Sequence, residues 1–254
     1  MEDGKIKVLF AGETWAVTKI HTKGFDVVQL GGFDDYSVYL KRALAKYQDI
    51  DITHIPNHLV LSQFPQTLEE LKTYDTIIVS DCGKNTLTMY SDMFKVPMGP
   101  DRLELIERYV REGGGFIMAG GYVCFQGFQE KGGYHGTQIE AILPVQISAR
   151  DDRVEATAGV TPKITKGDHP IMEGVPADKW PPFLGYNRLE GKPGSTVLAT
   201  DNDGNAFITV WECDKGRSLA FASDLAPHWG QAFVDWEFYP LFWYQAIKWT
   251  SGKE

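Results

Sequence analysis

The sequence is poor in cysteine. Its 254 residues contain three cysteines, an odd number, at the widely spaced positions Cys82, Cys124 and Cys213. Disulfide-stapled secreted domains have an even number of cysteines in a short chain, and many zinc sites have them in C-x-x-C pairs. The three cysteines therefore argue against both kinds of site and are typical of a protein from a reducing compartment.

Long hydrophobic runs are missing as well. No apolar stretch approaches the roughly 20 residues that a membrane-spanning helix needs. The N-terminal segment MEDGKIKVLF is charged and leads directly into a predicted strand, without the apolar region of a signal peptide. Together with the cysteines, these absences predict a cytoplasmic location and no membrane partner.

Basic residues are fewer than acidic residues. The chain has 25 lysines and arginines against 34 aspartates and glutamates, a formal net charge of -9, and no basic cluster. A nucleic acid or an anionic membrane surface is bound through a basic footprint. We therefore expect no nucleic-acid partner, and the expected partner is a small molecule.

Motifs for a metal or a nucleotide cofactor are also lacking. The histidines form no i, i+4 pair on one helix, since Pro56 separates His54 from His58. The glycines of residues 113–121 are not followed by lysine and serine or threonine, and no G-x-G-x-x-G follows the first predicted strand. The sequence thus predicts no metal site and no cofactor.

The first half of the chain alternates apolar strands with amphipathic helices. Strands are predicted at residues 5–11, 50–55, 76–80 and 116–119, and helices at residues 34–47, 67–72 and 101–111. Residues 13–33 are predicted to form a long loop, of the kind that is usually functional or a linker. The alternation is typical of a doubly wound α/β protein with a parallel sheet.

The second half departs from this alternation. Residues 145–215 favour strands and loops, which predicts an antiparallel β extension within a single domain of residues 1–254. Strands at residues 195–199, 206–211 and 218–222 are expected to form a meander. The closing helix, Val234–Trp249, is aromatic throughout, and Pro240 should kink it or start its main run. So many aromatic side chains exceed what one helix face can bury, which predicts a homo-oligomer interface here.

The stretch from Tyr109 to Gly136 organises the candidate site. A helix ends in glycines, the apolar strand Phe116–Ala119 follows, and that strand ends in Gly120-Gly121-Tyr122. Doubly wound proteins bind ligands outside the carboxyl ends of their strands, and small residues there allow a close approach. Polar and reactive residues come next, so we expect the active site here.

Two aspartates and two histidines are the candidate acid–base residues. Asp81 and Asp224 follow predicted strands, so their carboxyl groups should point into the crevice above the sheet, or alternatively cap the following turn. His135 and His228 lie in loops rich in glycine and aromatic residues, and imidazole titrates near neutral pH. All four residues could supply acid–base catalysis.

Cys124 is the candidate nucleophile. A thiol is reactive only when a cation, a helix N-terminus or a metal lowers its pKa. The alternative is a small buried residue of the core. The predicted ligand-binding residues around it are Gly121, Tyr122, Phe125, Gln126 and Trp229. The aromatic members could stack on a sugar ring, or they could belong to the core.

Several segments together carry a family resemblance that covers Lys5 to Trp249. They are Asp81-Cys82-Gly83, GGGFIMAGGYVCFQG at residues 113–127, GDHPIMEG at 167–174, LGYNRLEGKPG at 184–194 and GRSLAFASDLAPHWG at 216–230. In this combination the chain resembles the glutamine amidotransferase-like family of cytoplasmic proteins, within the class I glutamine amidotransferase-like superfamily. It is also distantly similar to trehalose-utilisation-type proteins, which share a segment like His169-Pro170-Ile171. The resemblance implies a flavodoxin-like three-layer α/β sandwich.

The resemblance also implies glutaminase residues, which this sequence matches only in part. A class I glutaminase has a cysteine in a G-x-C-x-G turn at the strand exit, and a histidine and a glutamate near its C-terminal end. Here Tyr122 stands at the cysteine position, Cys124 comes two residues later, and Asp224 and His228 are nearest to the second pair. A phenol with a pKa near 10 is a poor nucleophile.

We therefore predict a divergent hydrolase or isomerase without the normal glutaminase triad. Its expected ligand is a small polar, sugar-like metabolite in the crevice at the strand carboxyl ends. Two alternatives remain open: a non-catalytic ligand-binding or partner subunit, and an active glutaminase that uses Cys124. Fold alone does not choose between them.

Overall fold

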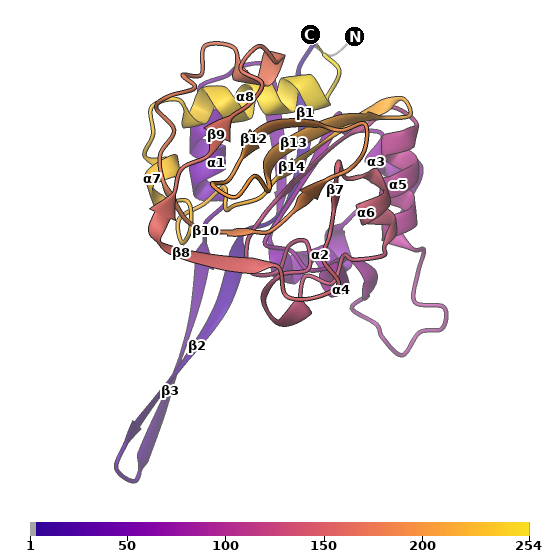
Figure 1. The fold of residues 1–254 in the computed structure, drawn as a ribbon. Coiled ribbons are helices and arrows are strands. Elements are labelled where there is room, and N and C mark those ends of the chain that lie inside the picture. Colours follow the sequence, from indigo (N-terminus) through magenta and orange to yellow (C-terminus); the bar gives the residue numbers. More distant parts are fainter. Residues whose placement is uncertain (1–3, 254) are drawn as a thin grey trace.

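An eight-stranded sheet forms the centre of the molecule (Figure 1). The computed structural model describes residues 4–253. Five neighbouring strands run parallel, in the order β4-β1-β5-β6-β14. Their bounds are β1 Ile6–Gly12, β4 Ile50–Ile55, β5 Thr76–Ser80, β6 Gly115–Ala119 and β14 Gly216–Phe221. The predicted mostly parallel central sheet is confirmed.

The central strands are apolar on both faces because both faces are covered. Every residue of β5 and of β6 is buried, as is typical of parallel strands between two layers of helices. The chain runs from β1 outward to β4 and then returns past β1 to β5. This reversal is the switch point of a flavodoxin-like sheet, and it lies between β1 and β5.

The predicted β-rich segment builds the antiparallel edge of the same sheet. β13 (Ala206–Cys213) pairs antiparallel with both β14 and β12 (Thr196–Thr200), which confirms the meander, and β9 (Lys163–Ile164) closes the edge. β14 also pairs in parallel with β6, so it belongs to both parts. The rest of the segment forms two short ladders: β7 Val145–Gln146 with β11 Glu190–Gly191, and β8 Arg153–Val160 with β10 Phe183–Asn187.

Helices cover both faces and complete the three layers (Figure 1). On β14, Phe221 packs against Trp243 of α8, whereas the Ser218 hydroxyl donates to the Ile142 carbonyl of α6 on the other face. The bounds are α1 Val38–Leu44, α2 Asn57–Gln63, α3 Leu68–Leu71, α4 Lys84–Thr88, α5 Arg102–Arg111, α6 Gln138–Ile142, α7 Gln231–Val234, α8 Tyr239–Thr250, and the 3-10 turns η1 Phe128–Glu130 and η2 Pro170–Met172. Among residues 4–253, no helix has the length and apolar character needed to cross a bilayer.

Some aromatic residues of the closing segment are buried within the chain, whereas Trp236, Phe238 and Tyr244 are partly exposed. Pro240 lies in the first turn of α8 and starts the main run of the helix. Phe242 and Trp243 are fully buried and pack against Phe221 and Phe233. The homo-oligomer interface at this helix stays a prediction.

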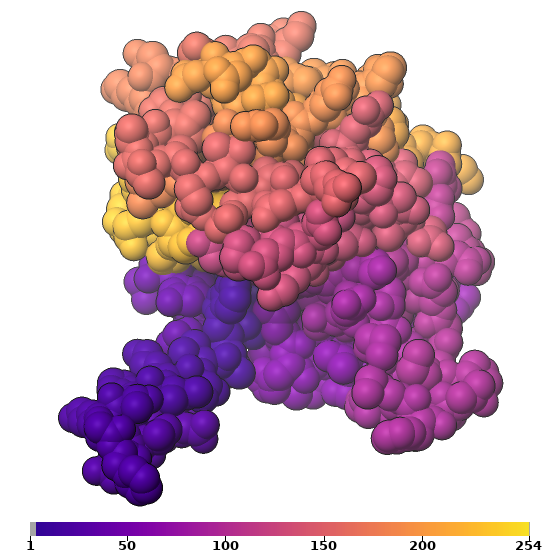
Figure 2. Space-filling view, turned by 60° about the horizontal axis from the view of Figure 1, so that its bottom comes forward, coloured from indigo at the N-terminus to yellow at the C-terminus, as the bar shows by residue number. Residues whose placement is uncertain are grey.

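Residues 13–33 do not form the predicted loop. β2 (Thr14–Lys23) and β3 (Asp26–Asp35) pair antiparallel along their whole length, and the resulting ribbon projects from the body (Figures 1 and 2). Both segments are rich in β-branched and other apolar residues, which favour strands. The loop prediction is wrong because it overlooked this composition on the two sides of Gly24. We call residues 14–35 the arm.

Candidate functional site

A crevice opens at the carboxyl ends of the parallel strands, beside the switch point. Its volume is about 240 Å³. Each of four neighbouring strands delivers a side chain to it: Glu13 follows β1, Asp81 follows β5, Tyr122 follows β6 and Asp224 follows β14. His228, four residues beyond Asp224, completes the set. Doubly wound sheets bind their ligands at this position.

Three carboxyl groups lie at the bottom of the crevice. Glu13, Asp81 and Asp224 are all buried, with 5% exposure at most. Burial raises the pKa of each: that of Asp81 to about 6, and those of Glu13 and Asp224 well above the ordinary values, with the charge of Asp81 raising both further. Neighbouring buried carboxyl groups cannot all ionise together. At neutral pH this group can therefore both donate and accept protons.

The backbone around these residues is strained. Glu13, Asp81 and His228 have φ angles of 56°, 43° and 80°, in the left-handed region that non-glycine residues rarely adopt. Local contacts hold the first two: the Ser80 hydroxyl donates to Glu13 Oε1 (2.5 Å), and the Val123 amide donates to Asp81 Oδ1 (2.9 Å). Strain of this kind concentrates at functional sites, where the surrounding structure fixes the side-chain direction.

Asp224 and His228 form a hydrogen-bonded pair at the mouth of the crevice. The distance from His228 Nδ1 to Asp224 Oδ2 is 3.0 Å, and the Trp229 amide also donates to Oδ2 (3.2 Å). When Asp224 is the ionised member of the three carboxyl groups, His228 Nδ1–H donates to it, and Nε2 is left as a proton acceptor. Burial lowers the pKa of His228, although the charge of Asp81 opposes that shift. The lowered pKa favours the neutral form of this half-exposed imidazole at physiological pH.

Aromatic rings position this imidazole. Trp229 stacks on the His228 ring with centroids 5.2 Å apart, and Tyr122 meets its edge at 4.5 Å. Glu155 of β8 holds both neighbours, since it accepts from the Tyr122 hydroxyl (3.1 Å) and from Trp229 Nε1 (3.2 Å). Trp229 is buried behind His228, whereas Tyr122 lines the crevice together with the rings of Trp15 and Tyr36.

Gly121 lies where the two aspartates converge. A Cβ placed on it would lie 2.4 Å from Asp81 Oδ1 and 2.9 Å from Asp224 Oδ1, at a φ of +146°. The buried Asn187 fixes this turn, since its Oδ1 accepts from the Gly121 amide (3.0 Å) and its Nδ2 donates to Asp152 (2.8 Å). The turn after β6 therefore requires glycine so that both carboxyl groups can approach it.

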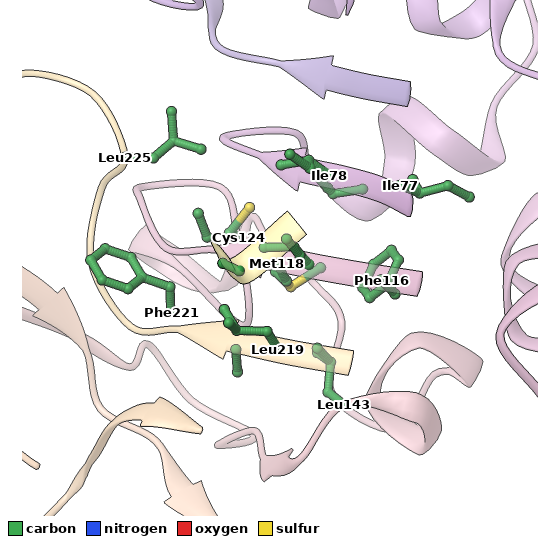
Figure 3. Close-up of a cluster of buried hydrophobic side chains, with 14 of the residues drawn as sticks. Ile77, Ile78, Phe116, Met118, Cys124, Leu143, Leu219, Phe221 and Leu225 are labelled. Carbon is green, nitrogen blue, oxygen red and sulfur yellow. The ribbon is translucent and has the colours of Figure 1, made fainter. Parts of the chain in front are cut away.

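Cys124 faces the core instead of the crevice. Its thiol is fully buried, and Figure 3 shows it among Ile78, Met118 and Leu225. Burial raises the pKa of this thiol well above the ordinary value, and the charge of Asp81 raises it further. Cys82 is also fully buried, with a pKa of about 12. These surroundings are the opposite of those that activate a thiolate.

The remaining predicted residues lie away from the crevice. His135 Nδ1 bonds the Ile147 carbonyl (2.8 Å) and lies 3.7 Å from Glu140. Phe125 is fully buried, and the Gln126 side chain bonds the Ala149 carbonyl (3.4 Å). The structure thus brings together Asp81, Tyr122, Asp224 and His228, with Gly121 between the two carboxyl groups.

Sequence reasoning missed Glu13 and Asn187. Glu13 directly follows the first strand, as Asp81 follows β5, and this position was the available signal. Asn187 acts through its contacts with the turn after β6, 66 residues away in the sequence. No local pattern marks such a contact.

Comparison with known proteins places the chain in a family. The family model described as "Putative glutamine amidotransferase" matches residues 7–252. The chain belongs to this family. Two solved structures are alike throughout: the cytoplasmic protein STM1381 from Salmonella typhimurium LT2 is 40% identical and STM3548 from Salmonella typhimurium is 35% identical. Each has a TM-score of 0.91, and each match covers 96% of this chain and 99% of the other.

More distant matches concern the fold alone. A ThuA-like protein from Parabacteroides merdae is 12% identical, with a TM-score of 0.56 over 97% of this chain and 90% of that one. A search of curated proteins returns no match. In this glutamine amidotransferase-like chain, the turn after β6 presents Tyr122 to the crevice, while Cys82 and Cys124 lie beneath it in the core.

Proposed function

We propose that the crevice binds a small, uncharged, hydroxyl-rich metabolite of sugar-like chemistry and transfers a proton on it, in a hydrolase or isomerase reaction. The observation that carries this proposal is the pair of His228 Nδ1 and Asp224 Oδ2, 3.0 Å apart, beside two further buried carboxyl groups. A base oriented by a carboxylate, next to carboxyl groups that retain protons, supplies both partners of general acid–base catalysis.

The charge of the crevice supports an uncharged ligand. Glu13, Asp81 and Asp224 face it, and among the described residues that line it there is no lysine or arginine. Phosphate and carboxylate ligands are recognised by cations or by arrays of amide donors. Hydroxyl groups, in contrast, donate well to carboxylates and accept from protonated carboxyl groups. The Tyr122 ring adds an apolar surface for the C–H face of a sugar.

The proposed roles follow from geometry and pKa. His228 Nε2 takes a proton from the substrate, and Asp224 holds the imidazole in that tautomer. Asp81 orients a substrate hydroxyl, and Glu13, whose pKa is raised by burial, donates a proton to a substrate oxygen from its protonated form. The buried Cys124 argues against the glutaminase alternative. We also infer a cytoplasmic location from the cysteines and the relatives named above.

Thermal unfolding with a panel of metabolites tests the ligand class. A ligand at 100 times its dissociation constant stabilises the native state by about 2.7 kcal/mol, which raises Tm by roughly 5–10 °C for a chain of this size. We expect this shift from uncharged aldoses, ketoses or polyols, and none from sugar phosphates or glutamine. His228→Gln should abolish the shift, whereas His21→Gln on the arm should keep it.

Two outcomes would contradict the proposal. One is stabilisation by phosphorylated sugars or by glutamine in place of uncharged sugars. The other is a sugar-induced shift that survives in His228→Gln and in Asp81→Asn, because the ligand would then bind outside the crevice. Binding without any turnover would instead support the non-catalytic alternative.

A further inference from the structure

The arm is a large structure with almost no support from the rest of the chain. Its two strands have ten residues each, and from Thr18 to Phe33 every residue is exposed. Figure 2 shows it extending away from the body. A lone two-stranded ribbon is only marginally stable in water, and its two free edges and two open faces invite pairing. The exposed surface of the arm therefore suits a contact with a second molecule.

The two faces of the arm differ in charge. Side chains alternate along each strand, and residues opposite one another share a face. The register pairs Ile20 with Gln29 and Thr22 with Val27. On that side the arm has no charged residue apart from Asp35, which pairs with Thr14 next to the body. We call it the uncharged face; its members are Ala16, Thr18, Ile20, Thr22, Val27, Gln29, Gly31 and Phe33.

The opposite face carries the charges of the arm. It includes Lys19 and Lys23, with Asp26 opposite Lys23. Near the body, Trp15 and Val17 of this charged face line the crevice. On the uncharged face, Ile20, Val27 and Phe33 are all more than half exposed, and the tip residue Phe25 is completely exposed. The charged face also exposes Val28 and Leu30, so the two faces differ in charge more than in apolar surface. Exposed apolar surface of this extent is typical of a contact with a partner.

We propose that two copies of this chain associate through their arms, uncharged face against uncharged face, about a two-fold axis. A two-fold contact joins the same patch on both copies, so the patch must be complementary to itself. An uncharged face meets this condition, since it brings no like charges together. Gly31 supports it as well: no other part of the chain lies within 4 Å of where its Cβ would be, so a side chain of the second copy can pack there.

The dimensions and charge of the arm also favour a second copy. Ten residues at about 3.4 Å each give a ribbon about 34 Å long and about 10 Å wide. The flat footprint of one face is thus about 340 Å². Its exposed side chains add accessible area to this footprint, and a stable interface has roughly 800 Å² per partner. The outer arm, residues 16–33, has two lysines and one aspartate. All three lie on the charged face, so this contact does not bring the lysines of the two copies together.

This dimer does not depend on the proposed function. It rests on the arm, whose outer part lies away from His228 and Asp224. Because Trp15 and Val17 at its base line the crevice, association would also hold one wall of that crevice in place.

Sedimentation velocity of the full chain over a range of concentrations tests the proposal. The wild-type protein should sediment at twice the 28.5 kDa of one chain at micromolar concentrations. The double substitution Ile20→Glu and Val27→Glu places carboxylates on the uncharged face and should give monomers. The matched control, Val28→Glu and Leu30→Glu, adds the same charge to the opposite face and should leave dimers.

Two further measurements separate loss of the dimer from loss of the fold and from a contact elsewhere on the chain. Both double variants should retain cooperative unfolding, since the substituted residues lie outside the core. Phe94→Ser with Val96→Ser removes exposed apolar side chains from the separate loop of residues 89–100 and should leave dimers. A wild-type monomer at every concentration, an equal effect of both arm variants, or dissociation by the loop variant alone would overturn the proposal. A heterologous protein would then be the occupant of the arm, or the contact would lie elsewhere.

Discussion

Replacing Asp81 by asparagine should stabilise the protein while it impairs the crevice. Asp81 is 5% exposed, and its Oδ1 accepts a hydrogen bond from the Val123 amide at 2.9 Å. The amide oxygen of asparagine can accept the same bond. Burial raises the pKa of Asp81 from 3.8 to about 6, even though the amides of Val123 and Tyr122 and the charge of His228 favour the ionised form. The ionised carboxylate is therefore destabilising at neutral pH.

Proton linkage sets the sign and the size of this effect. The native state binds the Asp81 proton more tightly than the unfolded chain does. The stabilisation is therefore complete below pH 3.8 and is lost as the pH rises to about 6. The shift from 3.8 to about 6, at about 1.36 kcal/mol per pH unit, corresponds to about 3 kcal/mol. Asparagine does not ionise, so D81N should gain about this much over the wild-type protein well above pH 6.

Urea unfolding across this pH range measures the effect. The free energy of unfolding of D81N minus that of the wild-type protein should be near zero below pH 3.8, grow with pH, and level off above about pH 6. Asp26→Asn is the control, because it removes a carboxylate from the exposed arm and not from the crevice. If D81N were less stable than the wild-type protein above pH 6, the buried carboxylate would be a net stabiliser, and our view of the crevice electrostatics would be refuted.

Three further predictions concern the same region. The thiols of Cys82, Cys124 and Cys213 are buried and should react with a thiol reagent only after unfolding; a fast thiol that disappears in Cys124→Ala would contradict this. Gly121→Ala should lower the free energy of unfolding by more than about 1 kcal/mol, because its Cβ would lie 2.4 Å from Asp81 Oδ1. Gly136→Ala, at a φ of +69° with nothing within 4 Å, should cost less, and an equal loss would show that strain alone matters. His135→Gln should retain the sugar-induced rise in Tm. Loss of that rise would show that the ligand binds at the loop of His135 and not in the crevice.

The parallel half of the fold was predictable because its strands carry their own signal. Thr76–Ser80 is apolar and fully buried, and the predicted range agrees with β5. The capping box of Thr67 and Glu70 forms at the start of α3. The arm was not predictable in the same way. Its β-branched composition favours strands, but the sequence does not show that these strands project from the body with their apolar residues exposed.

The site was predictable where it depends on strand ends and unpredictable where it depends on side-chain direction. Asp81 and Asp224 reach the crevice because each follows a parallel strand. Glu13 follows β1 in the same way, but it was assigned to the predicted loop of residues 13–33 and was therefore not considered as a site residue. Cys124 is two residues beyond Tyr122, yet one side chain faces the core and the other the crevice. The turn geometry sets these two directions, and hydrogen bonds from the turn to Asn187 and Asp152 hold it.

Exchange of substrate protons with solvent tests the central claim most directly. The best-stabilising sugar would be incubated in deuterium oxide with the wild-type protein, His228→Gln or Cys124→Ala, and loss of its C–H signals would be followed by proton NMR. For an isomerase reaction, the account predicts exchange with the wild-type protein and Cys124→Ala, and a rate about 10²–10⁴ lower with His228→Gln. Exchange that survives in His228→Gln but disappears in Cys124→Ala would contradict it and identify the thiol as the reactive group.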